Sequence, residues 1–75
     1  MTLKNLLCTM NFQNQVRIYT TGKTKTDLVL IFKGTSNNAI KYFKGCDKKM
    51  YSVVDFINLA MENEIKAPFI QIVIE

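Results

Sequence analysis

The sequence predicts a small α+β domain, in which short helices pack on an antiparallel sheet. Three observations support this class. Residues 28–32 form an uninterrupted apolar run with two β-branched members, which is too short for an ordinary buried helix. Residues 69–74 alternate so that three isoleucines share one side, as in a strand. Residues 3–10 instead place their apolar side chains at the spacing of a helix face.

The chain has 75 residues, the size of one domain, so we expect residues 1–75 to form a single unit. A domain this small buries a modest share of its surface and is marginally stable alone. Cys8 and Cys46 are too few for a disulfide framework, and their apolar neighbours favour two buried thiols. The remaining source of support is self-association, so we expect a homo-oligomer.

The composition argues against an enzyme. The chain has no histidine, so the usual acid–base group at neutral pH and the commonest metal ligand are both missing. The Gly-Lys-Thr sequence at 22–24 ends like a phosphate-binding loop, but Arg17 stands where the first glycine would be. We therefore expect no catalytic residues, no metal and no cofactor. No apolar run is long enough to span a bilayer, so we expect no membrane partner and a cytoplasmic location.

The first half of the chain predicts a helix followed by a hairpin. Thr2 is a suitable N-cap for a helix over residues 3–9. Residues 15–20 alternate apolar with polar side chains, which is typical of a half-buried antiparallel strand. A polar segment joins this strand to residues 27–34. Because residues 28–32 are apolar on both sides, they predict a strand covered on both faces, with a neighbouring strand at each edge.

The second half predicts a further helix, an ambiguous segment and a last strand. Ser36 suits the N-cap of a helix over residues 37–44, and a loop should follow up to Lys49. Residues 52–63 fit two structures. A capping box at their start favours a helix, which would leave a three-stranded sheet, whereas their β-branched and aromatic residues favour a strand. Residues 69–74 are the closing strand.

Charge is distributed unevenly along the chain. Residues 1–50 carry nine of the ten basic residues and two acids, whereas residues 51–75 carry one basic residue and four acids. Such asymmetry is typical of a basic face that meets an acidic partner. The candidate binding residues are those that the first hairpin should place together: Arg17, Tyr19, Lys23, Lys25 and Lys33. A second basic loop contains Lys48 and Lys49.

Several short motifs, taken in order, resemble a known group of proteins. They are Leu-Lys-Asn-Leu-Leu at 3–7, Val-Arg-Ile-Tyr at 16–19, Phe-Lys-Gly at 32–34 and the alternating isoleucines at 70–74. Together they resemble small accessory proteins of phages and prophages in Gram-positive bacteria. In such proteins the last two segments pair as a hairpin. The resemblance therefore implies the order α-β-β-α-β-β, with a four-stranded antiparallel sheet and two short helices.

The resemblance also implies a function. Phage accessory proteins of this size commonly bind a host protein and modulate or inhibit it, as anti-CRISPR proteins and other counter-defence inhibitors do. We therefore expect a protein that binds a host protein in the bacterial cytoplasm. The alternative partner is nucleic acid, because a sheet face with a tyrosine and several cations can stack bases and contact phosphates.

Overall fold

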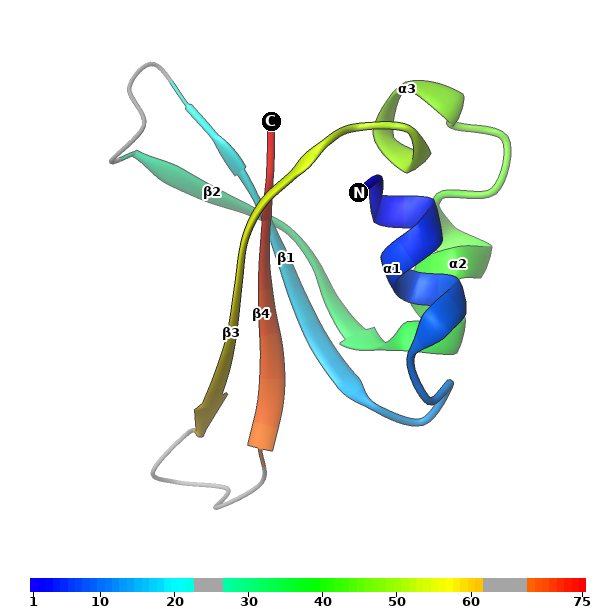
Figure 1. Ribbon diagram of the computed structural model, residues 1–75, viewed down its shortest axis with the longest axis vertical. Helices are drawn as coiled ribbons and strands as arrows, with labels where there is room; N and C mark the ends of the chain where they lie inside the picture. The colour runs from blue at the N-terminus through cyan, green and yellow to red at the C-terminus, as the bar shows by residue number, and fades with distance from the viewer. Residues whose placement is uncertain (23–26, 62–67) are drawn as a thin grey trace.

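A computed structural model describes residues 1–22, 27–61 and 68–75, with the side chains of all but residues 60 and 61 among them. It contains three short helices and four strands (Figure 1). In chain order they are α1 (Leu3–Thr9), β1 (Gln15–Thr21), β2 (Leu28–Thr35), α2 (Ser36–Tyr42), α3 (Asp47–Met50), β3 (Val54–Met61) and β4 (Pro68–Ile74). The three helices lie together on one side of the sheet.

The four strands form one mixed sheet in the order β2-β1-β4-β3. Two antiparallel hairpins, β1–β2 and β3–β4, are joined through a parallel pairing of β1 with β4. The α+β class and the four strands are therefore confirmed. The expectation of a wholly antiparallel sheet is wrong at its centre, because the helical connection after β2 is long enough to bring the second hairpin back alongside β1 in a parallel orientation.

Residues 52–63 form a strand rather than a helix over most of their length. Strand β3 pairs with β4 from Val54 opposite Ile74 to Met61 opposite Pro68. The alternative of a three-stranded sheet is therefore wrong. The structure also contains a helix that was not predicted, since α3 occupies part of the segment expected to be a loop. Gly45, with φ of +85°, ends the turn after α2 and allows the chain to enter α3.

The strand expected at the centre of the sheet lies at its edge. Strand β2 pairs only with β1 among the described strands, and Leu28, Val29 and Leu30 are 41–48% exposed. The central strands are β1 and β4. Strand β1 has one polar side because the sheet is covered by helices on one face only, so even a central strand is half-buried.

The core lies between the sheet and the helices. Three leucines of α1 pack against the inward side chains of the two central strands, and Ala39 of α2 and Phe43, which follows α2, complete the set. Its fully or nearly buried members are Leu3, Leu6, Leu7, Val16, Ile18, Ala39, Phe43, Ile72 and Ile74. Because β1 and β4 supply all of the strand residues in this set, the two central strands hold the core together.

Side-chain hydroxyls fix the starts of the two longer helices. Thr2 accepts a hydrogen bond from the backbone N–H of Asn5, as predicted for α1. The N-cap of α2 is Thr35 and not Ser36, one residue earlier than expected. Ser36 is instead fully buried, and its hydroxyl donates to the carbonyl oxygen of Leu7 at 3.3 Å. This bond links the start of α2 to the interior of α1.

Each outer strand contains one extra residue. In β2 it is Ile31, because Ile18 pairs with Phe32 and the next residue of β1 pairs with Leu30. In β3 it is Asp55, because Val54 pairs with Ile74 and Phe56 pairs with Val73, the preceding residue of β4. Such bulges bend a strand and increase its twist. The two bulges lie one position apart, on either side of the row that contains Tyr19 and Val73.

Both cysteines are exposed, so the prediction of buried thiols is wrong. Cys8 follows two buried leucines in the chain, but neighbouring positions on a helix point in different directions and Cys8 faces outward. Cys46 lies in the exposed turn before α3. None of the helices in the described part of the chain is long and apolar enough to cross a membrane.

Candidate functional site

The face of the sheet that is turned away from the helices carries two rows of side chains, which we call the open sheet face. Cross-strand pairing places residues of all four strands side by side in each row. The apolar row consists of Leu30, Tyr19, Val73 and Phe56, in the order β2-β1-β4-β3. The polar row, in the same order, consists of Lys33, Arg17, Gln71 and Asn58.

The apolar row is buried in its middle and exposed at its ends. Val73 is 5% exposed, because its neighbours in the row flank it on both sides. Leu30 is 48% exposed and Phe56 is 54% exposed. With strands about 4.8 Å apart, four residues span about 14 Å across the sheet. Large apolar side chains that are half-exposed at both ends of one row are typical of an interaction site.

The polar row contains two cations in direct opposition. Arg17 and Lys33 are cross-strand partners on β1 and β2, and like charges in this position destabilise a sheet. The guanidinium of Arg17 lies 4.0 Å from the ring centroid of Phe69, on the adjacent strand β4. This cation–π contact holds Arg17 against the sheet next to the apolar row.

The structure brings together three of the five residues predicted for the hairpin site. Arg17, Tyr19 and Lys33 lie on adjacent strands of the open sheet face. Lys23 and Lys25 lie outside the described residues. The predicted second basic loop is part of α3, where Lys48 is exposed and Lys49 is half-buried. Because α3 is on the helical side of the sheet, these two lysines belong to a different surface (Figure 1).

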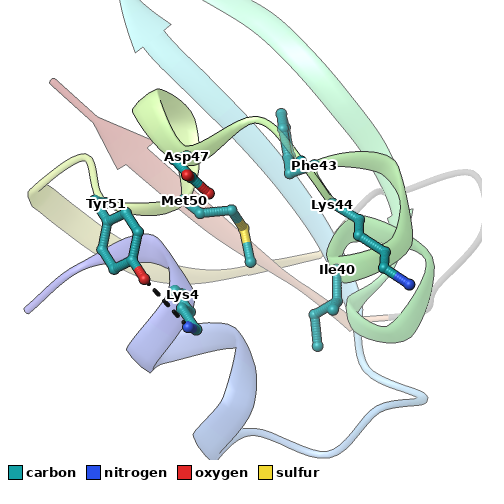
Figure 2. A pocket seen from close by; sticks show the side chains of 8 residues that line it. Lys4, Ile40, Phe43, Lys44, Asp47, Met50 and Tyr51 are labelled. Atoms are coloured by element: carbon teal, nitrogen blue, oxygen red, sulfur yellow. Dashed lines mark hydrogen bonds between the residues drawn. The ribbon is translucent and has the colours of Figure 1, made fainter.

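A small pocket lies on that second surface, between the three helices. Its volume is about 180 Å³, and Figure 2 shows Met50 near the middle of the residues that line it. The lining residues are Lys4, Ile40, Phe43, Lys44, Gly45, Asp47, Met50 and Tyr51. At one side, Nζ of Lys4 donates to the hydroxyl of Tyr51 at 3.3 Å and lies 5.3 Å from its ring centroid.

The helices around this pocket are strongly basic. Their lysines come from three separate segments: Lys4, Lys41, Lys44 and Lys48 are exposed, and Lys49 is half-buried. Asp47 is the one acidic residue in α1, α2, α3 and the turn between the last two. The sequence analysis did not group these lysines, because only the fold brings α1 next to α3. The dense basic stretch at 41–49 was the available signal.

Two further findings concern metal binding and similarity to known proteins. Within residues 1–22, 27–61 and 68–75, no group of three or more cysteine and carboxylate side chains could hold a metal ion. No protein-family model, curated protein or solved structure matches this chain. Arguments about its function therefore depend on the two surfaces described above.

Proposed function

We propose that this chain is a non-enzymatic binding module of the phage-accessory type, which occupies a surface of a host protein in the bacterial cytoplasm and so modulates or inhibits it. The observation that carries this proposal is the apolar row of the open sheet face, which crosses all four strands with exposed residues at both ends. The phage-type role itself rests on the resemblance of the short sequence motifs.

The chemistry of the open sheet face suits a protein partner. Protein interfaces have a desolvated centre rich in aromatic residues and arginine, surrounded by a polar rim. Here Tyr19 and Phe56 would lie in the centre with Leu30, and the polar row would form one side of the rim. The exposed Lys33 would meet a carboxylate of the partner. The host protein would be inhibited if the surface that this chain covers is one that the host protein needs for its own activity.

The test is capture of partners from a bacterial host lysate by the immobilised protein and by two matched variants. Leu30→Glu with Phe56→Glu places charges at both ends of the apolar row. Phe12→Glu, the control, places the same charge at a residue that precedes β1 and is 55% exposed. We expect one or more host proteins that the control retains and the double variant loses. If the double variant captures the same proteins as the wild type, the open sheet face is not the binding surface.

The alternative function is nucleic-acid binding, and one observation favours it. Tyr19 lies beside Arg17 and Lys33, so a stacked base could place its phosphates near both cations. The test is titration with labelled single-stranded and double-stranded DNA at two salt concentrations. Micromolar affinity that falls as salt rises, and that weakens in Lys33→Glu, supports this function. Absence of binding at both salt concentrations rejects it.

A further inference from the structure

We propose a second binding site on the helical side, where the pocket between α1, α2 and α3 takes one apolar side chain from an acidic peptide segment. This site is on the opposite side of the sheet from the open sheet face (Figure 1). It shares no residue with the open sheet face, so it does not depend on the proposed function. A peptide could occupy it whether or not a protein covers the other face.

The floor of the pocket selects an apolar group. Ile40, Phe43 and Met50 line it, and the first and last of these are partly buried residues packed against the core. Figure 2 shows the thioether of Met50 reaching into the space between the helices. Methionine adapts its shape to an incoming side chain because it is unbranched and flexible. The floor is therefore suited to an aliphatic or aromatic side chain.

The size of the pocket selects a side chain over a whole small molecule. Its volume of about 180 Å³ is below the range of roughly 300–1,000 Å³ that is usual for sites that bind small molecules and cofactors. A single leucine, methionine or phenylalanine side chain is the group that fits such a space. The rest of the peptide would lie across the surrounding surface.

The charge around the pocket selects an acidic peptide. Lys4 and Lys44 line the pocket, and α2 and α3 add the exposed Lys41 and Lys48 and the half-buried Lys49. Asp47 is the single opposing charge within these segments. Carboxylates on both sides of an apolar anchor would therefore meet lysines from different helices. Complementary charges of this kind fix the register of a complex and speed its formation.

Tyr51, the exposed aromatic residue at the pocket, favours a peptide over nucleic acid as the ligand. A nucleic-acid site of this type needs an accessible ring on which a base can stack. The ring of Tyr51 already has the ammonium of Lys4 5.3 Å from its centroid, and its hydroxyl accepts a hydrogen bond from the same group. The Lys4–Tyr51 pair therefore presents a positive charge to a ligand rather than a free aromatic ring on which a base could stack.

The experiment is a nuclear magnetic resonance titration of the isotope-labelled protein with synthetic peptides. The first probe is an octaglutamate with one central leucine, and the second has glycine in place of that leucine. The third is a single-stranded oligothymidylate of equal charge. We expect the leucine peptide to shift the signals of Ile40, Met50 and Tyr51 saturably, with at least about tenfold weaker binding for the glycine peptide, since burying one such side chain contributes about 1.5–3 kcal/mol.

Two charge reversals provide the matched control. Lys44→Glu changes the wall of the pocket, whereas Lys33→Glu makes the same change on the open sheet face. We expect the first to weaken binding of the leucine peptide several-fold and the second to leave it within twofold. Three results overturn the proposal: equal binding of the leucine and glycine peptides, tighter binding of the oligothymidylate at the same signals, or no saturable shift up to about 5 mM peptide.

Discussion

Truncation of Ile72 tests whether β4 is the centre of the sheet. Ile72 is fully buried and pairs with Ile18 on one side and Ile57 on the other. Replacing it with alanine removes three carbon groups, each worth about 0.8 kcal/mol, and leaves a cavity because the surrounding core relaxes only in part. We expect Ile72→Ala to lower the free energy of unfolding by about 3–4 kcal/mol.

The matched change is Leu30→Ala, which removes the same number of carbon groups from the edge strand. Leu30 is 48% exposed, so only about half of its apolar surface is lost from a buried environment and no cavity forms. We expect a loss of about 1 kcal/mol. For a domain of 75 residues the whole free energy of unfolding is about 4–11 kcal/mol, so the two variants should be clearly distinguishable.

Urea unfolding followed by circular dichroism measures both effects. With a slope near 1 kcal/mol per molar, the midpoint should fall by about 3 M in Ile72→Ala and by about 1 M in Leu30→Ala. The measurement is repeated at two protein concentrations. Self-association would bury Leu30, so the loss of unfolding free energy in Leu30→Ala would then depend on protein concentration. An equal loss in the two variants at low concentration would mean that Leu30 is as well buried as Ile72, which would contradict the position of β2 at the edge of the sheet.

Four other changes test separate features. Ser36→Ala should cost about 1–2 kcal/mol in urea unfolding, because the buried carbonyl of Leu7 loses its donor; no loss would mean that this bond contributes nothing. Gly45→Ala should cost about 1–2 kcal/mol, from backbone strain alone, since nothing lies within 4 Å of the added Cβ and φ is +85°. Light scattering at tens of micromolar should give at least twice the 8.6 kDa chain mass, and Val29→Lys on the edge strand should return a monomer; a monomeric wild type would contradict the expected homo-oligomer. Once a partner is captured, Lys33→Glu should slow its association, by an amount that shrinks as salt rises, whereas an unchanged rate would exclude this lysine from the rim.

The sequence predicted the elements better than their positions in the sheet. Helix α1, strand β1 and strand β4 begin and end within about two residues of the predicted bounds, because their periodicity is local. The position of β2 was wrong, since five consecutive apolar residues indicate burial on both faces but do not show which neighbours provide it. In this fold three of the five stay exposed or nearly so, at the edge of the sheet.

The candidate binding residues, too, were predicted only where the local sequence determines their position. The alternation of Arg17 and Tyr19 with buried residues placed both on the open sheet face correctly, because the side-chain period of a strand is two. The neighbours that complete the apolar row were not predicted, since Phe56 is far away in the chain and reaches the row only through β4. The basic surface of the helices was missed for a similar reason, because Lys4 joins it through the packing of α1 beside α3.

The parallel pairing of the two central strands has a consequence for how the chain folds. Each hairpin can form from residues close in sequence, but the β1–β4 ladder joins Val16 to Ile70 and needs closure of a loop that spans most of the chain. High contact order of this kind slows folding. During synthesis, the inner edge of β1 has no strand partner, and the core lacks Ile72 and Ile74, until β4 has left the ribosome. The nascent chain therefore keeps part of its future core exposed until β4 is available, and a chaperone that covers apolar segments would act on it in that interval.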